Sequence, residues 1–72
     1  MSEFTIKFFH SLKDIRIKRG YTQREVAERA AIHQSFLSSI EGGKTTNLRL
    51  ETIEKIINAL GVTIDIRYEK SE

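Results

Sequence analysis

The side chains in this sequence that could support catalysis or metal binding are two histidines and a few serines, and their spacing suits neither chemistry. His10 and His33 lie 23 residues apart, and the chain has no cysteine to complete a set of metal ligands. The serines at positions 35, 38 and 39 lack the glycine-rich elbow of a hydrolase nucleophile. The Gly-Gly-Lys stretch at 42–44 lacks the first glycine and the strand of a phosphate-binding loop. We therefore expect no enzyme, no metal and no cofactor.

Charge is a second chemical signal, and it points weakly toward nucleic acid. The net charge is only +2, a balance that many proteins without nucleic-acid partners share. Its distribution is more informative, because within residues 13–24 a single acid, Asp14, faces five bases. These bases are Lys13, Arg16, Lys18, Arg19 and Arg24. Lys18 and Arg24 either attract a nucleic acid at long range or are simply solvated.

A chain of 72 residues holds one domain, residues 1–72, and its apolar periodicity predicts that helices build it. Residues 8–19 and 48–60 place apolar side chains at helical spacing, and a glycine follows each stretch. Thr22 followed three residues later by Glu25 is the pattern of a capping box, which begins another helix. The alternation in residues 4–8 fits either a short strand or the first turns of the first helix.

The last part of the sequence, residues 62–69, changes to the period of two that indicates a strand. A single strand needs a partner for its backbone groups. A second copy of the same strand across a twofold axis would supply one, so we predict a dimerisation strand. An edge strand packed on the helices, or a frayed tail, are the alternatives. The apolar side of the predicted strand consists of Val62, Ile64, Ile66 and Tyr68.

The stretch around Ala31 decides whether residues 22–41 form one helix or two. A continuous helix would face Ile32 toward water and place His33 in the apolar stripe. A turn at Ala31 buries Ile32, which is worth about 2 kcal/mol. A left-handed alanine costs roughly 1–2 kcal/mol. The balance slightly favours the turn.

Residues 22–44, TQREVAERAAIHQSFLSSIEGGK, resemble the helix-turn-helix motif of the Xre/lambda-repressor-like family. The family usually has glycine where Ala31 stands, and a serine or threonine cap where His33 stands. The resemblance implies a mostly α, four-helix lambda-repressor-like fold, with the motif at 22–41 and a C-terminal β-strand at 62–69 that pairs across a homodimer. It also implies a structural ion pair between Arg16 and Glu41. The matching residues are Gln23, Ala27, Ile32, Leu37, Ile40 and Glu41.

The resemblance implies an interface with double-stranded DNA, in which the helix at 34–41 lies in the major groove. Gln34 is the best candidate for a bidentate contact to adenine, and Phe36 could touch a thymine methyl. The alternative is that the serines are ordinary solvated surface residues. The expected base-contacting residues are Gln34, Ser35, Ser38 and Ser39. We expect phosphate contacts at the start of the second helix and in the GGKTTN loop with its free amides, from Gln23, Arg24, Lys44, Thr45 and Thr46.

The motif followed by the strand is most similar to HipB-type antitoxins, which repress their own operon and bind a HipA-like kinase toxin. The resemblance thus implies a homodimeric repressor of an inverted-repeat operator. A phage-type repressor, a restriction–modification controller protein and a protein-interaction module without DNA binding remain alternatives. No apolar run approaches the roughly 20 residues of a membrane span, and residues 1–13 lack a secretion signal. We expect a bacterial cytoplasmic, nucleoid-associated protein.

Overall fold

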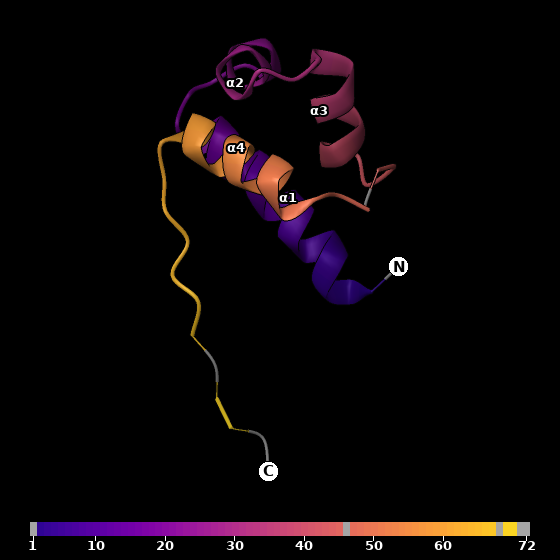
Figure 1. Cartoon of the computed structure of the whole chain (residues 1–72), viewed down its shortest axis with the longest axis vertical. Coiled ribbons are helices and arrows are strands. Elements are labelled where there is room, and N and C mark those ends of the chain that lie inside the picture. The colour runs from indigo at the N-terminus through magenta and orange to yellow at the C-terminus, as the bar shows by residue number, and fades with distance from the viewer. Residues whose placement is uncertain (1, 46, 68, 71–72) are drawn as a thin grey trace.

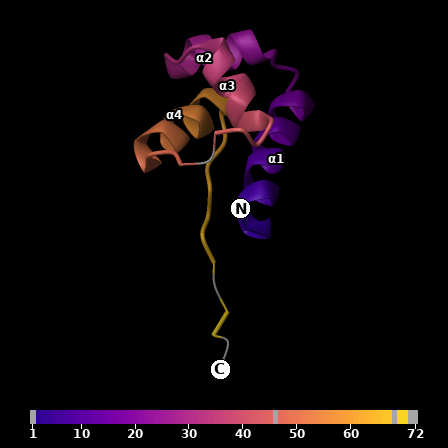
Figure 2. The ribbon, with the colours of Figure 1, turned by 90° about the vertical axis from the view of Figure 1, so that its right-hand side faces the viewer.

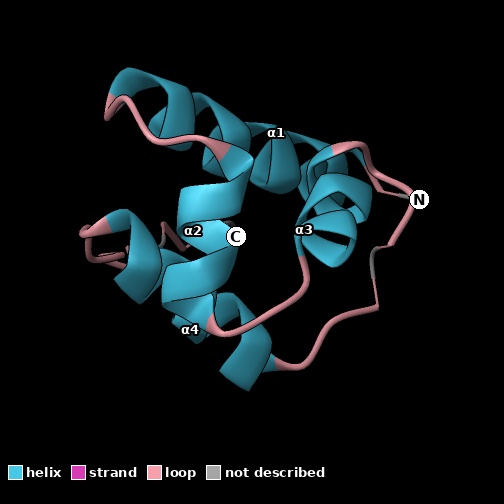
Figure 3. Ribbon diagram, turned by 90° about the horizontal axis from the view of Figure 1, so that it is seen from above, coloured by secondary structure: helices cyan, strands magenta, loops and turns pink. Residues whose placement is uncertain are grey.

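The fold consists of four helices followed by an extended segment (Figure 1). The computed structural model describes residues 2–45, 47–67 and 69–70. Helix α1 spans Glu3–Lys18, α2 spans Gln23–Ala30, α3 spans Gln34–Glu41 and α4 spans Leu50–Leu60. Seen from above, the four helices surround a common interior (Figure 3). The predicted mostly α, four-helix architecture is confirmed.

Helix α1 settles the ambiguity of residues 4–8, which belong to its first turns. Its N-cap is Ser2, whose hydroxyl accepts a hydrogen bond from the Thr5 amide at 3.1 Å. The rings of Phe4 and Phe8, one turn apart, stack with their centroids 6.2 Å apart. The alternating apolar and polar residues at 4–8 therefore belong to a helix, in which residues four apart are neighbours. They do not mark the two faces of a strand.

One apolar core joins the four helices. Arg29 adds a polar link from α2 to α4, because its guanidinium donates to the Ala59 carbonyl at 3.2 Å and lies 4.4 Å from the centre of the Tyr21 ring. The same guanidinium lowers the pKa of the Tyr21 hydroxyl. The largest fully buried side chains are Val26, Leu37, Ile40, Ile56 and Leu60.

All four helices end in the same way, in a Schellman motif. In each, one residue takes a left-handed conformation, and its amide and the next amide bond back to the last helical turn. In α1, for example, Gly20 donates to the Ile17 carbonyl and Tyr21 to the Arg16 carbonyl. Glycine tolerates this conformation because it has no Cβ. The left-handed residues are Gly20, Ala31, Gly43 and Gly61.

Ala31 is the exception among the four, and it marks the predicted turn. Its φ of 57° and ψ of 43° are left-handed, so the chain turns there and residues 22–41 form two helices. The Ile32 amide bonds to the Ala27 carbonyl at 3.0 Å, and the Ile32 side chain packs partly buried against the core. The prediction of a turn is confirmed, and burial of Ile32 accompanies it.

We expect Ala31→Gly to stabilise the domain by about 0.5–1 kcal/mol. Glycine removes a left-handed strain of roughly 1–2 kcal/mol, and its greater freedom in the unfolded chain returns part of that gain. The midpoint of thermal unfolding should rise by about 2–8 °C. Gly20→Ala is the matched control, because a Cβ there has open space yet the same unfavourable φ of +77°. It should destabilise the domain, and a lower midpoint for Ala31→Gly would contradict the assignment of strain.

The prediction of a strand over residues 62–69 is not supported. No strand occurs in residues 62–67 and 69–70, the part of this segment that the structure describes, and Tyr68 lies outside the described residues. A strand needs a neighbouring strand, and the one candidate within the chain, residues 4–8, is helical. Residues 62–67 instead leave the end of α4 as an extended segment and run toward the end of the molecule opposite α2 and α3 (Figures 1 and 2).

Candidate nucleic-acid interface

Helix α3 presents a polar side to solvent and an apolar side to the core. Gln34, Ser35 and Ser38 are exposed and Ser39 is half-buried. The opposite side carries Leu37, Ile40 and Glu41, each at most 5% exposed. The structure therefore brings together the four side chains that were predicted to contact bases. Phe36 is half-buried against the core, so its primary contact is with the protein.

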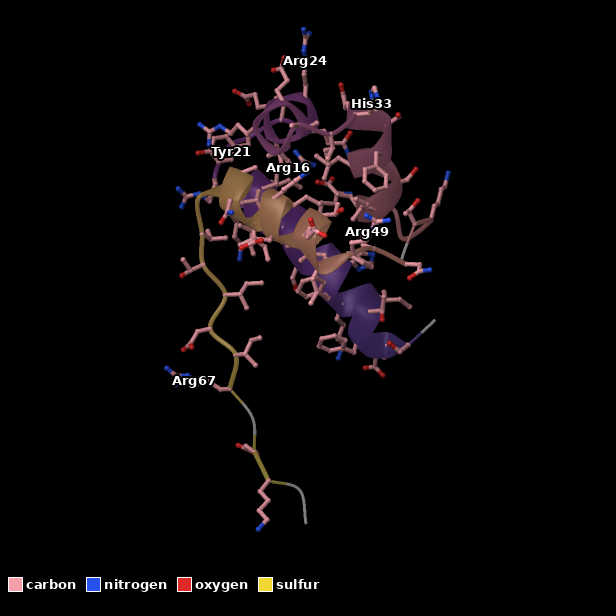
Figure 4. The ribbon with its side chains drawn as sticks, in the orientation of Figure 1. Arg16, Tyr21, Arg24, His33, Arg49 and Arg67 are labelled. Carbon is pink, nitrogen blue, oxygen red and sulfur yellow. The ribbon has the colours of Figure 1, made fainter. Side chains whose placement is uncertain are left out.

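His33 is the N-cap of α3, and its side chain makes no capping hydrogen bond. The first turn closes only through its backbone, as the Phe36 and Leu37 amides donate to the His33 carbonyl at 3.1 Å each. The predicted departure from a serine or threonine cap therefore leaves the first turn of α3 without side-chain support. The imidazole is exposed and lies near the same end of the molecule as Arg24 (Figure 4).

Helix α3 is fixed to the body by an ion pair between Glu41 and Arg16. The guanidinium donates two hydrogen bonds to the carboxylate, from Nε to Oε2 at 2.7 Å and from Nη2 to Oε1 at 3.0 Å. A third bond runs from Arg16 Nη1 to the Tyr21 carbonyl at 2.8 Å. The two side chains are only 11% and 4% exposed. The ion pair implied by the resemblance is present, and it is buried (Arg16 in Figure 4).

Gln23, predicted to contact a phosphate, takes part in this network. Its side-chain amide donates to Glu41 Oε1 at 3.0 Å, a bond that the sequence did not reveal. A carboxamide has two N–H donors, so one remains for a ligand. Gln23 thus connects the start of α2 to the end of α3.

The first turn of α2 is closed by the predicted capping box. The Thr22 amide donates to the Glu25 carboxylate at 2.8 Å, and the Glu25 amide donates to the Thr22 hydroxyl at 3.0 Å. The bond from the Thr22 backbone lowers the pKa of Glu25. The stabilisation by this carboxylate is therefore present above the ordinary glutamate pKa and is lost as the pH falls through the lowered value. The box leaves the Gln23 and Arg24 amides at the helix start, beside the exposed Arg24 side chain.

The loop after α3 differs from the prediction in one respect, since its first amides are not free. Gly42 donates to Ser38, Gly43 to Ile40, and both Lys44 and Thr45 donate to the Ser39 carbonyl. The Schellman motif that ends the helix accounts for the bonds of Gly43 and Lys44. The Lys44 side chain is exposed and that of Thr45 is half-buried. Thr46 lies outside the residues that the structure describes.

A second surface, which sequence analysis missed, is an apolar groove between α1, α4 and the extended segment. Its volume is ≈ 700 Å³, and Phe4, Phe8, Leu50, Ile53, Ile57, Ile64 and Ile66 are among its lining residues. Phe4 and Leu50 remain 75% and 82% exposed. The sequence does contain a signal for this groove. Residues 4–17 include more apolar residues than the core-facing stripe of one helix can hold, so some of them must lie on a second apolar surface.

Other kinds of site find no support in the described part of the chain. Residues 2–45, 47–67 and 69–70 contain no group of three histidine, cysteine, aspartate or glutamate side chains placed to hold a metal. Within the same ranges, no helix combines the length and the apolar character that crossing a membrane requires. The arrangement with the clearest chemical use is therefore the polar side of α3, flanked by the start of α2 and by Lys44.

Comparison with known proteins identifies the family. The transcriptional regulator SinR of Bacillus licheniformis is 38% identical over 62 residues, 85% of this chain and 56% of its own length. The putative antitoxin HigA2 of Mycobacterium tuberculosis is 40% identical over 55 residues, 76% of this chain and 54% of its own length. The chain thus spans about half the length of these curated relatives.

A solved structure and a family profile agree with these relatives. The structure is a variant of C.Esp1396I bound to its highest affinity operator site. It has 30% sequence identity and a TM-score of 0.80, and the match covers 88% of this chain and 82% of that chain. The profile described as helix-turn-helix, HTH_3, matches residues 12–66. The chain therefore belongs to the Xre-like helix-turn-helix family of transcriptional regulators.

Proposed function

We propose that this protein is a sequence-specific DNA-binding repressor that acts as a homodimer on an inverted-repeat operator. The observation that carries the proposal is the two-sided character of α3, whose polar side faces solvent while Glu41 anchors it to α1 and α2. A short helix held in this way can enter the major groove without bending. The match to a protein bound to its operator supports the same reading.

The contacts divide into base readout and phosphate binding. Gln34 is the main base reader, because its carboxamide matches the adenine N6 and N7 atoms. Ser35, Ser38 and Ser39 are short, so their contribution to discrimination is smaller. The phosphate contacts come from both sides of α3. They are made by Gln23 and Arg24 at the start of α2 and by Lys44, Thr45 and Thr46 in the loop after α3.

The homodimer places two α3 helices about one helical turn of DNA apart, roughly 34 Å. Residues 62–69 of the two copies pair as strands in this proposal. Because residues 62–67 run toward the end of the molecule opposite α2 and α3 (Figure 2), pairing along this segment leaves both recognition helices free to face DNA. Binding to operators in this way makes the protein nucleoid-associated.

The biological setting that we favour is a toxin–antitoxin operon. The similarity to a putative antitoxin supports an antitoxin that represses its own operon and also binds a toxin, for which a HipA-like kinase is the proposed partner. A phage-type repressor and a restriction–modification controller protein would use the same DNA interface. A toxin that binds the purified protein and alters its operator affinity separates the antitoxin from both.

Selection of binding sites from random duplex DNA at two salt concentrations tests the DNA-binding proposal. Enrichment of an inverted repeat by the purified protein would support both sequence-specific binding and the twofold dimer. The fall in affinity with salt counts the neutralised phosphates. If no sequence is enriched and binding disappears at moderate salt, the repressor proposal fails and a protein-interaction module takes its place.

The double variant Gln34→Ala, Ser38→Ala should abolish specific operator binding and leave complexes with protein partners intact. Loss of the Gln34 contact alone should cost about 1–3 kcal/mol, roughly 5- to 150-fold in affinity. Titration of the selected operator and of a scrambled duplex measures the effect. Asn58→Ala is the matched control, since it removes an exposed carboxamide from α4. Unchanged operator affinity in the double variant, with loss of a protein complex, would favour the interaction module.

A further inference from the structure

Three polar side chains, from the end of α1, the turn after it and α2, meet over the C-terminal end of α4. The Arg29 guanidinium lies 4.4 Å from the centre of the Tyr21 ring and donates to the Ala59 carbonyl at 3.2 Å. The Arg19 guanidinium reaches the same helix end, because a Cβ on Gly61 would lie 3.2 Å from its Nη2 atom. We call Arg19, Tyr21 and Arg29 the arginine–tyrosine cluster.

Both guanidiniums of the cluster act on the Tyr21 hydroxyl. They lower the pKa of this phenol, through contact with Arg29 first and with Arg19 second, because a positive charge nearby favours the phenolate. Tyr21 is half-buried, whereas both arginines are exposed. One hydroxyl group therefore lies within the reach of two positive charges that remain accessible to solvent.

No carboxylate balances these two charges in the part of the chain that the structure describes. None of the ion pairs there involves Arg19 or Arg29. Glu25, one turn before Arg29, is held in the capping box by the Thr22 amide at 2.8 Å. The end of α4 offers only its helix dipole, which is equivalent to about half a negative charge. More than one positive charge is therefore left without a partner.

The donors of the cluster indicate which anion would complete it. Arg29 has five N–H groups and uses one for the Ala59 carbonyl. Its other N–H groups, those of Arg19 and the Tyr21 hydroxyl remain for a ligand. A phosphate monoester has three acceptor oxygens and a charge of about −1.5 to −2 at neutral pH, whereas a carboxylate has two oxygens and a single charge. Three donor side chains with two positive charges therefore match a phosphate group better than a carboxylate.

The cluster lies away from the proposed DNA interface. In Figure 4, α2 separates Tyr21 from His33, the N-cap of α3. The apolar side of α3 packs into the common core, so its polar side points away from the other helices and from the cluster. An operator held by α3 would thus not bring its phosphates to Tyr21, and the ligand of the cluster must be a separate molecule.

We propose that Arg19, Tyr21 and Arg29 form a binding site for the phosphate group of a small molecule, either inorganic phosphate or a phosphate monoester. The two guanidiniums and the Tyr21 hydroxyl donate to the phosphate oxygens. The site goes beyond DNA binding, because its ligand is free in solution and binds on the face away from α3. Since the ligand binds only the folded chain, it stabilises the domain.

Tyrosine fluorescence measures binding at the cluster, because the chain has two tyrosines and no tryptophan. The variant Tyr68→Phe leaves Tyr21 as the only emitter. Its emission is titrated at neutral pH with inorganic phosphate and, in separate experiments, with glycerol phosphate and with acetate. Chloride keeps the ionic strength constant throughout. Thermal unfolding is followed in the same solutions.

Inorganic phosphate is expected to change the Tyr21 emission to saturation and to raise the midpoint of thermal unfolding over the same concentrations. Arg19→Gln should weaken binding about 10- to 100-fold, because it removes hydrogen bonds from a charged donor. Arg19 is exposed, so this variant stays folded. Arg49→Gln is the matched control and should leave the affinity unchanged, since it removes an exposed guanidinium at the other end of α4.

The two phosphate compounds distinguish the sources of the ligand. Tighter binding of glycerol phosphate than of inorganic phosphate would identify an ester as the ligand, because the glycerol group then adds contacts of its own. Equal or weaker binding of the ester would identify inorganic phosphate. Either result supports the site, provided that Arg19→Gln weakens the binding of both compounds.

Three results would overturn this inference. A linear change of emission with the same slope in Arg19→Gln would show collisional quenching and no site. Acetate binding as tight as phosphate would show that the cluster does not select phosphate. Arg19→Gln should change operator affinity less than about twofold, because solvent and salt screen a charge distant from the duplex; a larger loss would place the cluster on the DNA backbone. None of these results contradicts a repressor that reads DNA with α3, so the inference can fail while the proposed function stands.

Discussion

Glu41→Ala is expected to lower the free energy of unfolding by about 3–5 kcal/mol, the largest effect of any single change considered for this domain. The carboxylate is the partner of a nearly buried guanidinium, and its loss leaves the charge of Arg16 without compensation in a low-dielectric setting. The substitution also removes the acceptor of the Gln23 side-chain amide, which donates to Glu41 Oε1. A small domain has only about 5–15 kcal/mol of stability, so this loss should lower the urea midpoint of unfolding by a large fraction of its value.

The surface pair Glu3–Lys7 is the matched control for this prediction. Its atoms lie 2.9 Å apart, close to the 2.7 Å of the buried pair, but its side chains are 81% and 74% exposed. Glu3→Ala should cost less than about 1 kcal/mol, because water screens such pairs. The double variant Arg16→Met, Glu41→Leu should recover much of the loss, since neither charge is then stranded. A cost below about 1 kcal/mol for Glu41→Ala would show that the pair does not hold α3.

Removal of the extended segment is expected to convert the dimer to a monomer and to weaken binding to an inverted repeat by about 10²- to 10⁴-fold. The loss is that of bivalent binding, because two linked recognition helices bind far more tightly than one. Deletion of residues 63–72 is the sharper variant. It keeps Val62, which packs against the core and caps α4, whereas deletion of 62–72 should also reduce stability.

Sedimentation velocity and titration of two DNA duplexes distinguish the possible causes. On a duplex with a single half-site, the shortened chain should bind as well as the full chain, because its α3 surface is intact. A shortened chain that still sediments as a dimer would refute strand pairing. Equal weakening on the half-site and on the full repeat would instead indicate that residues 63–72 support the fold of α3.

The sequence predicted the helices and the buried positions well, since these follow from apolar periodicity. It also gave the turn at Ala31, although the free-energy difference between turn and continuous helix was small. The segment at 4–8 was ambiguous because five residues fit a period of two and a period of 3.6 almost equally. The occupied amides of the loop at 42–45 were missed because the loop was expected to leave its amides free for a phosphate. The left-handed conformation of Gly43 in fact directs those amides back to the helix.

The site itself was predicted in part. Helical periodicity indicates which residues of α3 face outward, so Gln34 and the three serines could be predicted as base-contacting residues. Residues 18 to 25 positions apart meet in the Gln23, Arg16 and Glu41 network, and no local pattern reveals the bond from Gln23. The groove was missed for a related reason, because it is formed by α1, α4 and the extended segment together.

The network around Glu41 also has a consequence for local opening of the molecule. Helix α3 has only eight residues, too few for an isolated helix to persist in water. Detaching it would expose Leu37 and Ile40 and break the contact with Arg16 on α1 and with Gln23 on α2 at the same time. The amides of α3 can then exchange with deuterium only when most of the domain unfolds, as part of one cooperative unit. The helix that we propose reads DNA would thus be as rigid as the core before any DNA arrives.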